Sequence, residues 1–228
     1  MSGSFYVSAT IGRESPTASS ERELLGAGLH DAFVAQLAPD GSVLWARAFG
    51  GTGDDRGSGV AVDEGSGSRP GVVYVSGRFT GEPGPPAVGG GGAGGGIRFG
   101  DAVFLSPATG AGDDVFMAQL RLSDGVANWA VAARGATSIP NLLDEFREEG
   151  VAVGADTFSP LGGAFFVGKV LGDAQFGVGG TAATRDTAGA GRLDGFACRV
   201  THQGAVDWVG TSRDCPPCHS THLKPSFI

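Results

Sequence analysis

The residues best suited to chemistry lie near the C-terminus, where two cysteines and two histidines come close together: Cys215, Cys218, His219 and His222. The run Cys-Pro-Pro-Cys-His matches the signature for covalent c-type haem attachment, in which two thiols bind the vinyl groups and the histidine binds iron. The same side chains are of the types that bind zinc, and two cysteines at this spacing can form a redox pair. They are the candidates for a metal site.

A haem site conflicts with the rest of the chain. A cytochrome packs a helical domain around its macrocycle, and only a short segment follows His219. Met117, the one methionine besides the initiator, lies in a predicted strand. We therefore interpret the tail as incidental and predict no cofactor, with haem c and zinc as the alternatives.

Acidic residues recur elsewhere, but their spacing favours a structural role. Asp54, Asp55 and Asp63 lie near glycines, yet the alternating acids and the closing glutamate of an EF-hand calcium loop are absent. We expect polar turns in which these carboxylates accept hydrogen bonds from backbone N–H groups.

A second acidic series stands at the start of three predicted strands, at Asp31, Asp114 and Asp194. These acids could form a ring of ligands, but a structural hydrogen bond repeated in each unit is the simpler interpretation, and we favour it. The chain has no Gly-x-Ser-x-Gly elbow, and its histidines suggest no Ser-His-Asp triad. We predict no catalytic residue.

Composition favours a strand-rich fold and argues against nucleic-acid binding and a membrane span. The 228 residues are 41% hydrophobic and include 42 glycines, and a glycine inside a helix costs about 1 kcal/mol relative to alanine. The net charge is −8 without a basic patch, which argues against nucleic-acid binding. No apolar run approaches the roughly 20 residues that span a bilayer, and the N-terminus lacks the features of a signal peptide.

Two aromatic positions recur at intervals of roughly 80 residues, which indicates an internal repeat. The two series are Phe33, Phe116 and Phe196, and Trp45, Trp129 and Trp208. Each unit should then be one packing module rather than part of a single irregular domain.

Each repeat contains a predicted β-hairpin. In the first, residues 31–37 and 42–49 flank Ala38-Pro39-Asp40-Gly41, where proline presets φ and glycine tolerates a positive φ. The later hairpins are predicted at 113–122 with 126–133, and at 194–200 with 205–209. Cys198 falls where the other repeats have alanine, which predicts a small buried side chain.

Two more strands are predicted in each complete repeat. Residues 59–63 (GVAVD) are typical of a buried inner strand, with 72–79 as its neighbour. Their expected counterparts in the second repeat are 150–153 and 164–171. In this alignment Phe166 matches Tyr74, and Gly154 replaces Asp63. Near the N-terminus, residues 5–11 match 72–79, with Tyr6 on Tyr74.

The remaining segments are expected to be irregular. Residues 12–30 are predicted as a loop with a helical turn at 21–25, and residues 81–96 as a low-complexity surface loop. Phe176-Gly177 echoes Phe99-Gly100.

Four short antiparallel strands per repeat predict an all-β chain of β-propeller blades. A closed propeller needs typically about 4–8 blades, so we expect an incomplete, open one whose first blade lacks its inner strand. The predicted divisions are a partial first blade and loop (1–30), the first hairpin and following inner strands (31–80), a Gly/Pro-rich insert and loop (81–112), further blades (113–210) and an irregular tail (211–228). The expected core residues are Phe33, Val34, Leu37, Trp45, Val60, Val62, Tyr74, Val75, Phe116, Trp129, Val151, Val153, Phe166, Phe196 and Trp208.

The repeated segments resemble the SBBP repeat family, whose units carry D-x-F-V-A-K-L, G-x-x-x-W-A, G-G-x-G-D-x-x-x-x-V-A-V-D and V-Y-V-x-G-x-F elements. The resemblance is strongest over 31–79, and Gln36 and Gln119 stand where lysine is usual. It implies a propeller with no defined catalytic residues and an extracellular or cell-surface location.

The function expected from these features is a non-enzymatic binding or scaffold module, with a protein or carbohydrate partner. The alternatives are a quinoprotein-like propeller oxidoreductase and an electron-transfer protein that uses the CPPCH tail. Open blade faces would also expose apolar surface, which predicts self-association.

Overall fold

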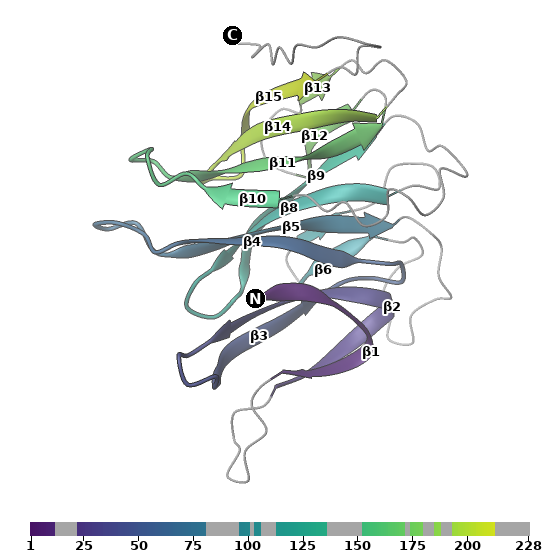
Figure 1. The fold of residues 1–228 in the computed structure, drawn as a ribbon, viewed down its shortest axis with the longest axis vertical. Helices are drawn as coiled ribbons and strands as arrows, with labels where there is room; N and C mark the ends of the chain where they lie inside the picture. The colour runs from purple at the N-terminus through teal and green to yellow at the C-terminus, as the bar shows by residue number, and fades with distance from the viewer. Residues whose placement is uncertain are drawn as a thin grey trace.

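The computed structural model is an all-β protein, and no helix occurs in the part of the chain it describes. The described residues are 1–11, 22–80, 96–100, 103–105, 113–135, 152–171, 174–179, 185–187 and 193–212. Three antiparallel sheets are stacked along the long axis, with the first at the bottom and the third at the top of Figure 1.

The first sheet has the order β1-β2-β3. Its strands are β1 (Ser2–Ile11), β2 (Arg22–Leu37) and β3 (Val43–Phe49). The predicted loop and helical turn are therefore wrong for residues 22–30, because Leu25 pairs with Ser8 and Arg22 pairs with Ile11 across a long hairpin. Ladder hydrogen bonds to β1 outweigh the weak local signals of this Gly-rich segment.

The second sheet has the order β13-β12-β9-β8-β5-β4, and the third has the order β10-β11-β14-β15. The second contains β4 (Arg56–Asp63), β5 (Val72–Thr80), β8 (Asp113–Arg121), β9 (Ala127–Gly135), β12 (Ala174–Val178) and β13 (Arg185–Thr187). The third contains β10 (Ala152–Ala155), β11 (Gly163–Leu171), β14 (Leu193–Thr201) and β15 (Val206–Ser212).

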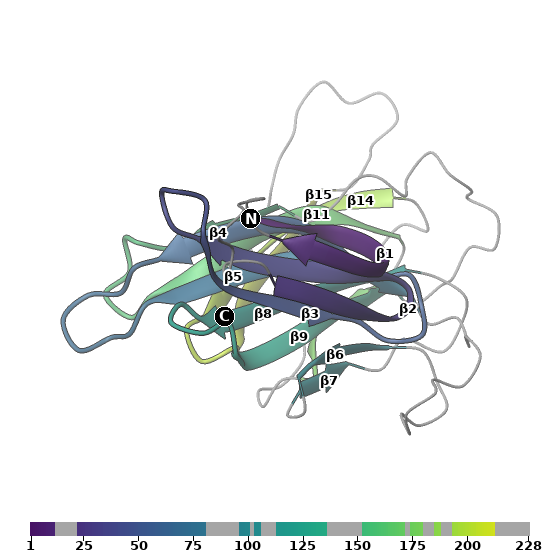
Figure 2. The same cartoon turned by 90° about the horizontal axis from the view of Figure 1, so that it is seen from below.

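A small ribbon, β6 (Ile97–Phe99) with β7 (Val103–Leu105), lies beside β9 (Figure 2). Arg98 of this ribbon bridges Gly50 beyond β3, just as Gln175 of β12 pairs with Arg134 near the end of β9. Phe99 and Phe176 are both buried, and Gly100 and Gly177 both have positive φ. The predicted echo is confirmed.

One pairing recurs in all three sheets and shows how they correspond. A glycine lies opposite the repeated phenylalanine: Gly3 opposite Phe33, Gly77 opposite Phe116, and Gly168 opposite Phe196. Ser2–Phe5 therefore corresponds to Ser76–Phe79. The predicted match of Tyr6 to Tyr74 is wrong, because the ladder with β2 shifts β1 out of that alignment.

The same comparison corrects two assignments in the third sheet. Cys198 corresponds to Ala118 and pairs with Phe166, while Ala118 pairs with Val75, so Phe165 rather than Phe166 takes the place of Tyr74. A one-residue shift moves a side chain to the opposite face of a sheet.

The acid at the end of the inner strand is also retained. Val60 pairs with Val75 and Val153 with Phe166, so Asp156 corresponds to Asp63 and Gly154 to Ala61. The predicted replacement of this aspartate by Gly154 is wrong, since the structure aligns 152–156, not 150–153, with the GVAVD segment.

Most expected core residues are removed from solvent. Val34, Trp45, Tyr74, Val75, Phe116, Phe166 and Phe196 are buried, and Phe33, Leu37, Trp129, Val153 and Trp208 are half-buried. Val60 and Val62 are exposed, which contradicts the prediction of a buried inner strand, because β4 is the edge of its sheet. Val151 and the insert at 81–95 lie outside the described residues.

Candidate functional site

The first and second sheets are joined by a tryptophan that packs on the turn of the next hairpin. Trp45 Nε1 donates to Leu122 O at 2.8 Å. Gly125 in this turn has φ of 71°, and a Cβ there would lie 2.5 Å from the Trp45 ring. Glycine is needed for both the backbone conformation and the close approach.

The second and third sheets are joined in the same way. Trp129 Nε1 donates to His202 O at 3.0 Å. Gly204 has φ of 86°, and a Cβ there would lie 2.8 Å from the Trp129 ring. A tryptophan on one sheet therefore contacts the turn of the next at both junctions between sheets.

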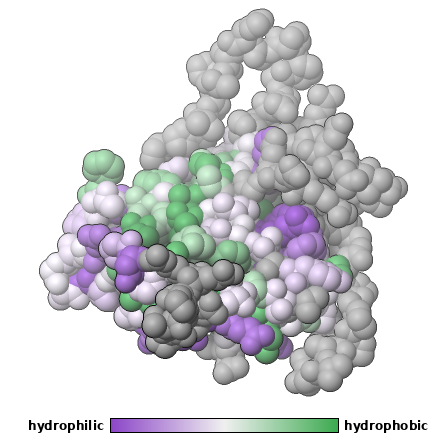
Figure 3. Space-filling model, turned by 60° about the horizontal axis from the view of Figure 1, so that its bottom comes forward, coloured by the Kyte–Doolittle hydropathy of each residue, from purple (hydrophilic) through white to green (hydrophobic). Residues whose placement is uncertain are grey.

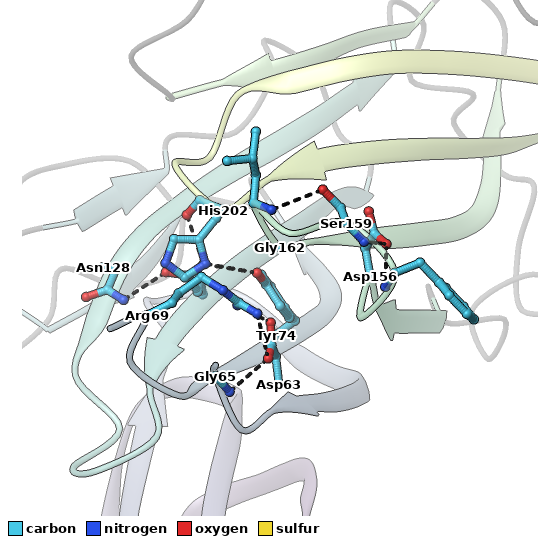
Figure 4. A network of polar contacts seen from close by, with 12 residues as sticks. Asp63, Gly65, Arg69, Tyr74, Asn128, Asp156, Ser159, Gly162 and His202 are labelled. Atoms are coloured by element: carbon cyan, nitrogen blue, oxygen red, sulfur yellow. Dashed lines mark hydrogen bonds and ion pairs between the residues drawn. The ribbon is translucent and has the colours of Figure 1, made fainter. Parts of the chain in front are cut away.

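A polar network surrounds the second of these contacts (Figure 4). Gln119 Nε2 donates to His202 O at 2.9 Å and lies 3.3 Å from Tyr74 OH. Asn128 Nδ2 donates to Gln119 Oε1 at 2.8 Å. The network links β5, β8 and β9 of the second sheet to the β14–β15 turn of the third.

An ion pair borders this network at the end of β4. Arg69 donates to both carboxylate oxygens of Asp63, and Gly65 N donates to Asp63 Oδ1 at 2.9 Å. Burial alone would raise the Asp63 pKa, but the hydrogen bond from Arg69 brings it below its ordinary value.

Two titratable groups in the network are held neutral near pH 7. Burial raises the pKa of Tyr74, although a hydrogen bond from Gln119 opposes the shift. Burial and the charge of Arg69 lower the pKa of His202. A neutral imidazole and a neutral phenol suit a structural contact between sheets.

The third sheet repeats the acid-to-arginine contact with a different arginine. Arg199 Nε donates to Asp156 Oδ2 at 2.9 Å, and Arg199 Nη2 donates to Gly162 O at 3.1 Å. Asp156 Oδ1 accepts from the backbone N–H groups of Phe158 and Ser159. These bonds hold the β10–β11 turn in shape.

A second polar cluster lies at the opposite end of β4, between the first and second sheets. Asp54 contacts His30 Nδ1 at 2.8 Å, Arg56 Nε at 3.1 Å and Arg78 Nη2 at 3.3 Å. Burial alone would raise the Asp54 pKa, but the bond from Arg56 and the nearby charges lower it.

Two buried acids accompany this cluster. Asp55 Oδ2 accepts from Gly51 N at 2.8 Å, and Asp31 Oδ2 accepts from Ala27 N at 2.9 Å. Burial, with the nearby Asp31 and Asp54 charges, raises the pKa of Asp55 to about 8. Burial also raises the pKa of Asp31. Asp55 Oδ1 has no hydrogen-bond partner among the described residues.

The acids considered for calcium do not converge. Asp54 and Asp55 precede β4, whereas Asp63 ends it and pairs with Arg69. Within the described ranges, no group of three or more His, Cys, Asp and Glu side chains could hold a metal ion. The predicted capping of backbone N–H groups is confirmed for Asp55 and Asp63.

The second acidic series is distributed one residue to a sheet. Asp31 and Asp114 are buried. They pair with Phe5 and Phe79, and Asp194 pairs with Val170 at the corresponding place. The hydrogen bond from Ala27 to Asp31 supports the structural interpretation for that position.

The cysteine predictions have different outcomes. Cys198 is buried, its Sγ lies 3.6 Å from Met117 Sδ, and burial raises its pKa to about 12, so the predicted small buried side chain is confirmed. Cys215, Cys218, His219 and His222 all lie outside the described residues, so the tail motif stays a prediction.

Sequence reasoning missed the network around Tyr74 and His202. The available signal was Gln119, which stands where the resembled repeat has lysine; its amide can donate and accept at once. Arg69 gave no signal, because it lies in an irregular turn whose path depends on the strand pairing.

Comparison with known protein families gave no match, and comparison with curated proteins also gave none. The described part of the chain contains no helix long and apolar enough to cross a membrane.

Proposed function

We propose that this chain is a non-enzymatic β-propeller repeat segment that serves as a binding or scaffold module. The observation that carries the proposal is the stacking of sheets in one register through the same tryptophan-to-turn contact. Face-to-face stacking of small twisted sheets buries both apolar faces of each, as in propeller blades. The resemblance of 31–79 to SBBP repeats supports the same assignment.

The polar groups between sheets favour binding over catalysis. Gln119 and Trp129 bond to the backbone of the neighbouring turn, and the acids at the strand ends pair with arginines. Groups engaged in this way stabilise the stack. A catalytic base would instead need to reach a substrate proton within hydrogen-bond distance.

The β10–β11 turn offers the surface that suits a partner best. Phe158 is 97% exposed and Leu161 is 73% exposed, on a turn held by Asp156 and Arg199. An aromatic ring on a rigid turn supplies apolar contact area at a low cost in ordering. Protein segments and sugar rings both use such a surface, so the partner is a protein or a carbohydrate.

Arrays of peptides and of oligosaccharides, probed with the purified chain, test this proposal. The double variant Phe158→Ala and Leu161→Ala should lose at least tenfold in affinity for any ligand found, with an unchanged circular dichroism spectrum. Leu25→Ala is the matched control, since Leu25 is 71% exposed on the first sheet. Binding that survives the double variant, or the absence of any ligand on both arrays, would contradict the assignment of this surface.

A further inference from the structure

The three hairpin turns share one hydrogen-bond pattern, although the second is one residue longer than the others. Among the described residues, only the second and third turns receive a tryptophan. The residue before each turn donates its N–H across it: Ala38 to Ser42, Arg121 to Val126, and Thr201 to Ala205. Pro39 therefore corresponds to Leu122 and His202, the residues whose carbonyls accept from Trp45 and Trp129. Gly41 has φ of 86°, matching Gly125 and Gly204.

In the part of the chain that the structure describes, no indole ring covers the first turn, in contrast to the other two. Gly125 and Gly204 are buried under an indole ring, whereas Gly41 is only half-buried. Leu37 and Ala46 are half-buried, while their counterparts Leu120 and Ala130 are buried by the first sheet. The far end of the β1–β2 hairpin, where Ile11 and Leu24 lie, covers part of this face.

Figure 3 tilts the first-sheet end toward the viewer and shows apolar surface exposed beside polar surface on this side. The outward face of the first sheet therefore has the features of the faces that are buried inside the stack.

At the other end of the stack, the outward face of the third sheet is also only partly covered. Phe165 is 37% exposed and Val167 is 47% exposed, although their counterparts Tyr74 and Ser76 are fully buried beneath the next sheet. Trp208 contacts Phe165 with ring centroids 6.2 Å apart, much as Trp129 contacts Tyr74 at 6.3 Å.

Trp208 is half-buried and, unlike Trp45 and Trp129, its indole N–H meets no turn carbonyl among the described residues. This face presents the tryptophan half of the contact that joins the sheets.

We propose that the third sheet of one copy of this chain docks on the first sheet of a second copy, head to tail. Trp208 would pack on Gly41 of the second copy and donate its indole N–H to the Pro39 carbonyl. The Trp45–Gly125 and Trp129–Gly204 contacts inside the molecule show which residues would meet across this interface. The interface joins two different faces, so it is heterologous, and it yields rings or open chains rather than an isolated symmetric dimer. This goes beyond ligand binding, because it concerns assembly of the chain with itself.

Each face can be blocked by one substitution. Gly41→Asn keeps the turn, because asparagine tolerates positive φ, but it adds a Cβ where the indole must pack. Gly67→Asn is its control, since Gly67 also has positive φ and a Cβ added there would meet only open space. Val167→Glu places a charge on the other face, and Val62→Glu, at 49% exposure, is its control.

Sedimentation velocity over a wide range of concentration is the measurement. The unmodified chain and both controls should associate as concentration rises, whereas Gly41→Asn and Val167→Glu should each stay monomeric with an unchanged circular dichroism spectrum. A mixture of these two variants should form a dimer, because each retains the face that the other lacks.

A monomeric unmodified chain at every concentration would overturn the proposal. Association of either face variant as strong as that of the unmodified chain would overturn it too, as would a mixture that stays monomeric. Loss of association in Val167→Glu alone would indicate a symmetric contact between two third sheets, which also overturns it.

Discussion

At the scale of single residues, the tryptophan contacts combine apolar packing with a hydrogen bond, and the two contacts differ in one respect. The Leu122 carbonyl receives its bond from Trp45, whereas the His202 carbonyl receives bonds from both Trp129 and Gln119. Leaving a buried acceptor without a partner costs about 1–3 kcal/mol. The His202 carbonyl therefore keeps one hydrogen bond when the indole N–H of Trp129 is lost.

We predict that Trp45→Phe costs more stability than Trp129→Phe. The first should lose about 1–3 kcal/mol through the unpaired Leu122 carbonyl beyond the change in packing, and the second should lose less. Trp45→Ala, which also removes the buried ring, should cost about 3–5 kcal/mol. Urea denaturation measures all three, and equal losses for the two phenylalanine variants would contradict the argument.

Asp55 makes a pH-dependent contribution to stability. Its folded pKa of about 8 lies above its unfolded value, so the folded chain binds an additional proton between these values. Stability from this group is fully present below the unfolded pKa and is lost as pH rises through about 8. The slope reaches about 1.4 kcal/mol per pH unit between the two values.

The variant Asp55→Asn tests this contribution, because asparagine is neutral throughout and can still accept from Gly51 N. Unfolding free energies from pH 5 to pH 8, over which about 1.4 kcal/mol per unit is expected from Asp55, should fall more steeply in the unmodified chain than in Asp55→Asn. Histidine titration is common to both proteins and cancels in the difference. Parallel pH profiles would show that Asp55 is ionised in the folded state near neutrality.

At the scale of elements, the decisive feature is that β4 is a sheet edge and β5 is internal. Val62 and Val75 lie on these neighbouring strands, but only Val75 is buried. The short apolar run of β4 is therefore only partly covered, because no further strand pairs with its outer side among the described residues.

We predict that Val75→Thr costs about 1–3 kcal/mol, because it buries a hydroxyl in an apolar environment. Val62→Thr should stay within about 0.5 kcal/mol of the unmodified chain, since its side chain faces water. Thermal or urea unfolding of the two variants gives the comparison. A large loss of stability in Val62→Thr would show that this side of β4 is buried.

At the scale of the whole molecule, the sheets share apolar clusters and a repeated contact rather than one central core. One cluster lies between the first and second sheets, with Phe79, Phe99 and Phe116, and another lies between the second and third, with Met117 and Phe166. Ribbon β12–β13 follows β11 in the chain yet extends the second sheet. The second and third sheets are therefore linked by this ribbon as well as by packing.

We predict a far-UV circular dichroism spectrum of strand type, with a single minimum and without the paired minima of helix. The expectation follows from the absence of helix in the described residues and from the helix-breaking glycine content. A spectrum dominated by helix would contradict the all-β assignment.

The candidate site was only partly accessible from the sequence. The recurring tryptophans and turn glycines were visible as a pattern, but their contact with the next unit was not, because it joins residues about 75 positions apart, such as Trp45 and Leu122. The partners of Asp63 and Asp156 differ as well, Arg69 in one unit and Arg199 in the other. A shared position with different partners leaves no common sequence signal.

The sequence by itself determined the all-β class, the three hairpins and most of the buried aromatic positions. Turn chemistry is local, and alternation with period two is visible in each strand. Only the tertiary structure decided the register. Residues 151–156 (VAVGAD) can be aligned with 59–63 (GVAVD) in two ways. Near the N-terminus, either Ser2–Phe5 or residues 5–11 could correspond to β5. Pairing with the neighbouring strand selects between them, because a slipped strand would place its side chains on the wrong face.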